Sequence, residues 1–520
     1  MQSLSQKIAR NTIFNVAGRL WGIGITFFIT PYIISHLGAE RFGLWAITGV
    51  VTGYFGLLDF GIGASFVKYI AEFYAQDDYY KINQLVNSGV VFYSLFAALI
   101  IGLMAALLPS LLVFLKIPSY LYSEAKFIFL AAVSLLAVSN AFSPIGALQT
   151  GLQRMDISNK ITMALSIPYI IGVVFFMENG FGLRGLLINN AIIFMLNSIL
   201  NLAAAFRVFP QLRFKPFMSS KEVFKKLFFF GGKLQIARIS SLISTHMDKL
   251  IVNRFLSLSQ VVFYQLGSSI IEAMKSLALL LPSAIMPAFS ELDAKKERKR
   301  LVDGYVRSSR YLILAVTPLF TFSFVCAAQF MIIWMGKGYE KAAVIVQILS
   351  VGWGLAVMSS MRSAIVQAIG KPEIEMQAGL LAAAFNIPLS IVFVIKFGFL
   401  GAALGTSISL ILSVIYGYIK LHKEIQLNFW IFAKEEILPA VVLCVGVATA
   451  VGIFTRLFCA IIPDYGRITA FFIFIVQAVL FFGIYLKALS CLKPLHKGDI
   501  SALSGRRWFL LRQLLTKLSR

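Results

Sequence analysis

The chain contains fourteen separate apolar segments of 17 to 28 residues, which is the length range of membrane-spanning helices. A helix of about 20 apolar residues spans the hydrocarbon core of a bilayer, so each segment predicts one transmembrane helix. Hydrophobic residues make up 59% of the chain and charged residues 13%, which excludes a soluble globular fold, intrinsic disorder and coiled coil. The predicted spans are 10–35, 42–66, 83–108, 124–149, 161–177, 184–206, 228–253, 261–288, 311–335, 343–368, 373–395, 399–419, 437–458 and 468–487.

The basic residues are concentrated in alternate loops. The chain has 47 Lys and Arg against 23 Asp and Glu, a formal net charge of +24. With the N-terminus in the cytoplasm, the inside loops hold 32 of the basic residues and the outside loops hold 10. This count assigns to the adjoining loop six basic residues near span ends: Arg10, Lys126, Arg184, Lys233, Arg456 and Lys487. Cytoplasmic loops carry such an excess, so we predict an inner (plasma) membrane protein with both termini in the cytoplasm. The excess is then a topology signal, and no nucleic-acid partner is expected.

The two halves of the chain repeat each other at a nearly constant offset. YIISHLGAERFGLW (32–45) matches LIVNRFLSLSQVVFY (250–264), Ile167-Pro168 matches Ile387-Pro388, and FGLRG (181–185) matches FGFLG (397–401). A duplicated six-helix unit predicts two lobes around a central cavity, which is typical of transporters. We predict an N-terminal six-helix lobe at 1–208, a cytoplasmic amphipathic linker at 209–227, a C-terminal six-helix lobe at 228–422, two additional spans at 423–490, and a basic amphipathic cytoplasmic tail at 491–520.

Arginines at equivalent positions of the two repeats are the first candidate site residues. A charge within a span costs at least about 2.5 to 3.5 kcal/mol unless it meets water or a partner. Arg19 and Arg238 fall near the midplane of the first and seventh spans, and Asn15 and Gln235 lie one turn away. We predict that these four residues bind substrate in a shared cationic cavity. The alternative is that each arginine has only a structural role.

The acids within the spans are candidates for ion coupling. Glu272 and Asp248 are the stronger candidates and Asp59 is a third. Glu272 and Lys275 are three residues apart, so mutual neutralisation is the alternative for that acid. Asp59 and Arg362 are close to cytoplasmic ends, where snorkelling or loop capping is expected as often as function.

Catalytic and metal-binding motifs are absent from the sequence. It contains no G-x-S-x-G, H-E-x-x-H or P-loop, and its four cysteines have no C-x-x-C spacing. We therefore expect no enzyme activity, no metal and no cofactor.

Several segments resemble a known transporter family. SHLGAERFGLWAI (35–47), LLDFGIGASFVKYIAEF (57–73) and MDKLIVNRFLSLSQVVFYQL (247–266) are similar to the polysaccharide transporter family of the multidrug/oligosaccharidyl-lipid/polysaccharide exporter superfamily, which includes Wzx-type flippases. The resemblance implies a flippase that moves an undecaprenyl-diphosphate-linked oligosaccharide from the cytoplasmic to the outer leaflet by alternating access. It also implies that the family's cavity arginines are Arg19 and Arg238, which would bind the diphosphate. Membrane lipids, a polysaccharide polymerase and glycosyltransferases are the partners it implies.

Three other functions stay open at this stage. The first is an ion-coupled drug or metabolite exporter of the same superfamily, and the excess of basic over acidic residues within the spans mildly disfavours it. The others are a membrane-embedded polysaccharide polymerase or ligase, disfavoured by short outer loops, and a scaffold for envelope assembly. The spans at 437–458 and 468–487 lie outside the repeat and are almost free of charge, so we predict that they form an apolar groove for a polyprenyl tail.

Overall fold

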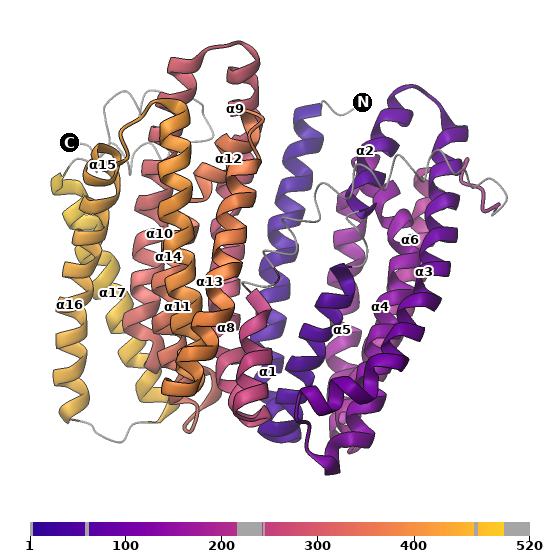
Figure 1. Cartoon of the computed structure of the whole chain (residues 1–520), viewed down its shortest axis with the longest axis horizontal. Coiled ribbons are helices and arrows are strands. Elements are labelled where there is room, and N and C mark those ends of the chain that lie inside the picture. Colours follow the sequence, from indigo (N-terminus) through magenta and orange to yellow (C-terminus); the bar gives the residue numbers. More distant parts are fainter. Residues whose placement is uncertain (1–3, 58–61, 216–241, 243–244, 462–465, 493–520) are drawn as a thin grey trace. The chain divides into compact units, whose positions relative to one another are not determined.

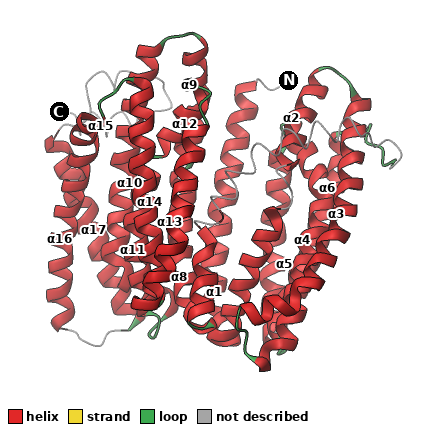
Figure 2. Cartoon of the chain, in the orientation of Figure 1, coloured by secondary structure: helices red, strands yellow, loops and turns green. Residues whose placement is uncertain are grey.

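The described part of the chain is helical throughout. The computed structural model describes residues 4–57, 62–215, 242, 245–461 and 466–492, and all regular elements in these ranges are helices (Figure 2). Eleven of them are long and apolar enough to cross a membrane. The prediction of an all-α, multi-span membrane protein is therefore confirmed.

The predicted count of fourteen spans is not confirmed. The first two predicted spans form one continuous element, α1 (Leu4–Gly56), which is broken at Gly38. Gly38 has φ 75° and ψ 170°, a conformation that glycine adopts without steric cost, so one residue separates two helices. The seventh predicted span (228–253) falls mostly outside the described residues, and the eighth is divided between α8 (Leu258–Ala278) and α9 (Leu280–Ala294).

Contacts within the chain divide it into two compact units (Figure 1). Unit 1 comprises Met1–Gln265 and Val394–Ala402, and unit 2 comprises Leu266–Phe393 and Ala403–Arg520. The lobe boundaries expected from the sequence repeat stay predictions.

Unit 1 contains the first six long helices. After α1 these are α2 (Ile62–Ala75), α3 (Tyr79–Phe114), α4 (Tyr122–Gly151), α5 (Met155–Glu178) and α6 (Gly182–Val208). The N-cap of α3 is Asp78, whose side chain accepts a hydrogen bond from the backbone N–H of Lys81 at 3.0 Å. The contacts of this carboxylate with the Lys81 ammonium and backbone N–H hold the pKa of Asp78 below its usual range.

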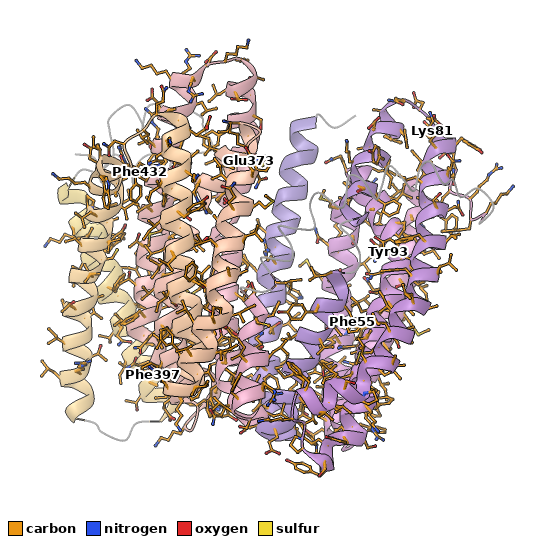
Figure 3. The ribbon with its side chains drawn as sticks, viewed as in Figure 1. Phe55, Lys81, Tyr93, Glu373, Phe397 and Phe432 are labelled. Carbon is orange, nitrogen blue, oxygen red and sulfur yellow. The ribbon has the colours of Figure 1, made fainter. Side chains whose placement is uncertain are left out.

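The core of unit 1 is an apolar cluster between α2, α3, α4 and α6. Its largest buried side chains include Phe66 and Tyr93, and Ile145 and Ala205 complete its α4 and α6 sides. Figure 3 labels Tyr93 of this cluster. A Cβ on Gly89 would lie 2.3 Å from Cζ of Phe66, so this glycine allows α3 to approach α2 closely. We call this set of residues the unit 1 apolar cluster.

Unit 2 contains the remaining helices. They are most of α8 and all of α9, followed by α10 (Arg298–Met335), α11 (Glu340–Met358), α12 (Ser360–Ala368), most of α13 (Glu373–Phe397) and α14 (Phe399–Ile425), α15 (Phe429–Phe432), a π-helical turn η4 (Ala433–Ile437), α16 (Leu438–Ile461) and α17 (Arg467–Leu492). Phe481 of α17 packs with Val447 and Val451 of α16, and Phe322 of α10 covers this contact.

The helix boundaries support the internal repeat. The paired starts are Ile62 of α2 with Leu280 of α9, Met155 of α5 with Glu373 of α13, and Gly182 of α6 with Phe399 of α14. These pairs share one offset to within a single position, and so do the ends of α4 and α12 at Gly151 and Ala368. Residues of unit 1 and unit 2 can therefore be compared position by position along these helices.

Candidate functional site

The arginine predicted for the first repeat lies on an exposed face of α1. Arg19 is exposed and makes no hydrogen bond or ion pair within the described ranges. Close to Arg19, Trp21 Nε1 donates a hydrogen bond to Ser166 Oγ at 2.8 Å and so joins α1 to α5. Gly18 also lies against α5, because a Cβ at this position would be 3.6 Å from Asn159 Oδ1. The guanidinium of Arg19 is thus available to a ligand, and polar groups of α5 lie close to its helix.

Four of the predicted site residues cannot be compared with the structure. Arg238, Gln235 and Asp59 lie outside the described residues, and for Asn15 only the backbone, within α1, is described. Their roles stay predictions.

Asp248 lies in a fully buried polar contact of unit 1. It is 0% exposed and accepts a short hydrogen bond from Tyr264 Oη, at the N-terminal end of α8. The adjacent Lys249 is also buried, and Tyr54 of α1 donates to Met247 Sδ at 3.5 Å. The Asp248 carboxylate therefore has a hydrogen-bond donor, as a charge at this depth requires.

Glu272 forms the local ion pair that its spacing allows. Lys275 Nζ lies 2.6 Å from Glu272 Oε1, and the same ammonium sits 3.9 Å from the ring centroid of Trp353. The Glu272 side chain is 42% exposed, whereas that of Lys275 is 15% exposed. The aromatic ring and the carboxylate together stabilise a mostly buried lysine, so the structure contains the mutual neutralisation that sequence spacing allowed.

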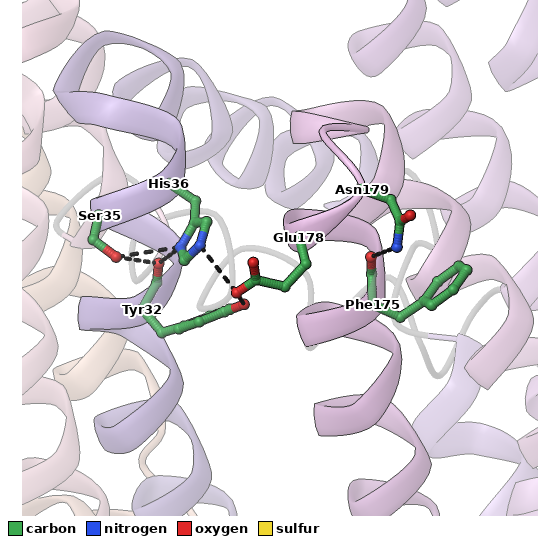
Figure 4. A network of polar contacts seen from close by, with 6 residues as sticks. All are labelled: Tyr32, Ser35, His36, Phe175, Glu178 and Asn179. Carbon is green, nitrogen blue, oxygen red and sulfur yellow. Dashed lines mark hydrogen bonds and ion pairs between the residues drawn. The ribbon is translucent and has the colours of Figure 1, made fainter.

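A polar network joins α1 to the end of α5 in unit 1 (Figure 4). Tyr32 Oη donates to Glu178 Oε1 at 2.7 Å, and His36 Nε2 lies 3.4 Å from the same carboxylate oxygen. Arg41 Nε lies 3.1 Å from Glu124 Oε2 of α4. Sequence analysis missed this network because its members are ordinary loop-flanking residues, and only the packing of α1 on α5 brings them together.

Arg362 is buried, and snorkelling does not account for it. Its side chain is 5% exposed, and its Nη2 is 3.4 Å from Glu375 Oε1. A Cβ on Gly417 of α14 would lie 1.6 Å from Nη1 of Arg362, so the guanidinium fits only because residue 417 is a glycine. Nothing in the local sequence around Arg362 indicates this contact with a helix that comes much later in the chain.

A partly buried arginine, Arg310, was missed because it was counted with a loop. Arg310 of α10 donates from Nε and Nη2 to the two carboxylate oxygens of Glu436 at 2.6 and 2.5 Å. Glu436 is 4% exposed, and this bidentate geometry is the strongest form of the ion pair.

In the described ranges, no three His, Cys, Asp or Glu side chains come together as a metal site would require.

Comparison with known proteins identifies the family. The sequence profile of the family described as "Polysaccharide biosynthesis protein" matches residues 8–293, more than half of the chain. The chain belongs to this family. Members of the polysaccharide biosynthesis protein family share the N-terminal helices and the start of the second repeat with it, and the suspected polysaccharide transporter relationship is confirmed.

Curated relatives carry transporter names. A Shigella flexneri protein named "Putative O-antigen transporter" is 24% identical over 417 residues, which cover 78% of this chain and 96% of the relative. A protein of Haloferax volcanii named as a probable low-salt glycan biosynthesis flippase is 21% identical and covers 86% of this chain and 91% of its own length. These relatives are named as transporters and flippases, not as enzymes.

Solved structures share the fold. The lipid II flippase MurJ in an inward closed conformation superimposes with a TM-score of 0.70 at 16% identity, covering 93% of this chain and 98% of MurJ. An inward-facing multidrug resistance MATE family transporter has a TM-score of 0.64 at 16% identity, covering 80% of this chain and 94% of the transporter. At these identities the likeness establishes the fold alone.

Proposed function

We propose that this protein flips an undecaprenyl-diphosphate-linked oligosaccharide from the cytoplasmic to the outer leaflet of the plasma membrane, by alternating access. The observation that carries the proposal is the family match over residues 8–293. Relatives named as an O-antigen transporter and a glycan flippase support it, as does the shared fold of a lipid II flippase. A polysaccharide polymerase and glycosyltransferases are the partners that such a reaction needs on its two sides.

The chemical problem in this function is the diphosphate. It must leave water and cross hydrocarbon, where an unpaired charge is costly. Arginine offers a planar set of donors that binds phosphate oxygens in pairs, so Arg19 and Arg238 are the residues we propose for this contact, with Asn15 and Gln235 beside them. The guanidinium of Arg19 is exposed and unpaired within the described part of the chain, which supports this role.

We further propose a separate place for the apolar tail. α16 and α17 enclose a cavity of about 100 Å³ lined by Phe454, Thr455, Thr469, Phe472, Ile473, Val476 and Gln477. The outer faces of these helices are apolar, since Phe472 is 63% exposed and Leu457 is 65% exposed. Such a surface suits a polyprenyl chain, whose transfer into an apolar site is favourable.

The energy source is the third part of the proposal. Glu272, Asp248 and Asp59 are the acids proposed for ion coupling. Glu272 and Asp248 already have partners in this structure, so a coupling role requires that those contacts change during the cycle.

The test is flipping by the purified full-length protein in liposomes, with a fluorescent undecaprenyl-diphosphate-linked oligosaccharide as probe. Arg19→Ala is expected to slow flipping by at least about tenfold, because a charge-assisted contact with the diphosphate is lost. Arg19→Lys is expected to restore only part of the rate. Arg207→Ala is the matched control, since Arg207 is an exposed arginine of the same unit.

Two results would contradict the proposal. Undiminished flipping by Arg19→Ala would exclude Arg19 from the diphosphate site. A wild-type protein that flips no lipid-linked oligosaccharide but expels a lipophilic cation would instead be a drug exporter.

A further inference from the structure

A buried cluster of unit 2 contains polar atoms that have no hydrogen-bond partner. The cluster consists of Arg362, Glu375, Tyr305, Tyr418 and His422, and we call it the Arg362 cluster. Four of the buried side-chain atoms without a partner in the described ranges belong here: Nε and Nη1 of Arg362, Oε2 of Glu375 and Nδ1 of His422. An unpaired buried polar group costs about 1 to 3 kcal/mol, so this concentration calls for a functional explanation.

The remaining contacts of the cluster hold these groups in place. Tyr305 Oη lies 3.0 Å from His422 Nε2, and the rings of Tyr418 and His422 are 5.5 Å apart. Arg362 lies close enough to both tyrosines to interact with them electrostatically. Four helices, α10, α12, α13 and α14, therefore contribute to one polar interior, toward the end of unit 2 where Glu373 and Phe432 lie (Figure 3).

Unit 1 fills the equivalent positions differently. In the register that aligns the end of α12 with the end of α4, Arg362 corresponds to Ile145 and His422 to Ala205, both in the unit 1 apolar cluster. The same register pairs Glu375 with Ser158. The same register pairs Tyr418 with Asn201, which is also buried in unit 1, so the difference between the units lies in the charged pair and the histidine. A buried ion pair is often no more stable than well-packed apolar residues, so packing does not require this one.

The charged groups around the cluster are already paired with one another. Lys371 Nζ is 2.5 Å from Glu424 Oε1 at the edge of α14, and Arg310 binds Glu436 of η4. On α13 itself, Glu373 is exposed. Glu375 is different from these groups. Its Oε1 lies 3.4 Å from Nη2 of the buried Arg362, which is a long ion-pair distance, and its Oε2 accepts no hydrogen bond from the described residues.

We propose that the Arg362 cluster is a proton-binding site that couples a proton gradient to transport, and that Glu375 receives the proton. The proposal rests on the transport function proposed above. The proton comes from water on the predicted cytoplasmic side, which the 34% exposed Glu375 side chain can reach. An O–H bond forms on the Glu375 carboxylate, which becomes a neutral acid, and the Arg362 guanidinium loses the anion it pairs with.

The loss of this ion pair has a structural consequence. Arg362 and Glu375 lie on consecutive helices, joined by a turn in which Gly370 has φ 70°. Removal of the attraction between them favours a rearrangement of α12 against α13. The proton would then select between two arrangements of unit 2, as coupling requires.

The experiment compares flipping with and without an imposed proton gradient, in liposomes containing the full-length protein. The wild type is expected to flip faster with the gradient, by about fivefold or more. Glu375→Gln is expected to lose the response to the gradient, because its side chain can no longer take up a proton. Glu373→Gln is the matched control, because it removes an exposed acid two residues away, and it should respond like the wild type.

A second variant keeps the proposal testable if Glu375→Gln alone does not fold. Arg362→Ile, Glu375→Ser and His422→Ala together install the unit 1 residues and should fold, yet show no response to the gradient. A substrate-free readout is hydrogen exchange of segment 360–377 at two pH values after correction for the intrinsic rate. Its protection should depend on pH in the wild type and Glu373→Gln, and not in Glu375→Gln.

The possible failures can be told apart. A wild type that flips no oligosaccharide would contradict the proposed function, and pH-independent exchange of segment 360–377 would then also contradict the proton site. A wild type that flips equally with and without the gradient, or a Glu375→Gln variant with a full response, would overturn the proton site while the flippase function stands.

Discussion

The interiors of the two units differ most at equivalent positions of their repeats. Between α4 and α6 of unit 1, Ile145 and Ala205 belong to the unit 1 apolar cluster. The uncharged polar residues Gln149 and Asn201 are buried on the same two helices, and Gln149 Nε2 donates to the backbone oxygen of Asn201 at 2.9 Å. The corresponding helices of unit 2, α12 and α14, carry Arg362 and His422. Both arginine and histidine are as buried as their apolar counterparts, with 4% and 1% of their surfaces exposed.

This difference separates what the repeated fold needs from what function adds. Helix boundaries and turns recur in both halves, so the backbone tolerates either filling. The positions of Arg362 and His422 are apolar in unit 1, although Oε1 of Gln149 and Oδ1 of Asn201 on the same helices are buried without a partner. In unit 2, Arg362 fits only because residue 417 is a glycine, and nitrogen atoms of Arg362 and His422 still have no hydrogen-bond partner. Burying unpaired polar atoms costs free energy, and packing alone does not explain that cost.

The most direct way to break the comparison is to place the unit 2 residue in unit 1. Ile145→Arg would bury a charge among Phe66, Leu148 and their neighbours without an acid at the position that Glu375 occupies in unit 2. We expect a loss of at least about 5 kcal/mol, because an unpaired buried charge and a displaced apolar side chain add up. Ile145→Leu should cost less than about 1.5 kcal/mol. The apparent melting temperature of the purified protein measures both, and a stable Ile145→Arg protein would refute the equivalence drawn here.

The next largest effect concerns the ion pair that is specific to unit 2. Glu436→Ala leaves Arg310, whose side chain is 20% exposed, without its bidentate partner. The expected loss is about 3 to 5 kcal/mol, the usual result of breaking a buried pair. Glu297→Ala is the control, since Glu297 pairs with the exposed Arg300 at 2.7 Å and should change stability by less than about 1 kcal/mol. Equal melting temperatures for the two variants would contradict a structural role for the buried pair.

A smaller loss of stability is expected at Gly417, the glycine that makes room for the Arg362 side chain in unit 2. Gly417→Ala would bring a Cβ to 1.6 Å from Nη1 of Arg362, and such overpacking costs about 1 to 3 kcal/mol. Gly483→Ala in α17, which has nothing within 4 Å of the added Cβ among the described residues, should not destabilise the protein. Combining Gly417→Ala with Arg362→Ile should reduce the cost. If the cost stays the same in that double variant, Arg362 is not the group that the added methyl meets.

The smallest expected effect compares the starts of two equivalent helices. α3 begins with the capping carboxylate of Asp78, whereas the N-cap of α10, Glu297, makes no side-chain capping bond. Asp78→Ala should therefore lower the melting temperature slightly at neutral pH. Because folding lowers the pKa of Asp78, its contribution is complete above the unfolded value of about 3.9 and is lost as the pH falls through the lower folded value. The difference between variant and wild type should shrink below about pH 4, and a constant difference would exclude the capping charge as its cause.

The sequence predicted the parts of the fold that depend on neighbours along the chain. Apolar runs long enough to span a bilayer located the membrane helices, and the turns at Gly180 and Gly398 recur where the repeat expects them. The first two predicted spans are separate helices, but a single residue and not a loop separates them. Hydropathy cannot distinguish a short loop from a single glycine with positive φ, and Gly38 supplies the latter.

The candidate site residues also fall into two groups: those that the local sequence indicates and those that only contacts between helices reveal. Charge within a span indicated Arg19, Asp248 and Glu272 directly, because any ionisable group at that depth is unusual. Arg310 was counted as a loop residue, because its ion pair depends on Glu436, which lies 126 positions away.

By itself, the sequence determined the class of protein, the helical repeat and the family, since each is encoded in local hydropathy, charge and motif. Only the tertiary structure decided which charged residues are buried and which of their atoms remain unpaired. Arg362 lies near the end of its helix and has an ordinary neighbourhood in the sequence. Its burial comes from a carboxylate on the next helix, α13, and from a glycine on α14, which comes much later in the chain. The contact with α14 leaves no local pattern in the sequence.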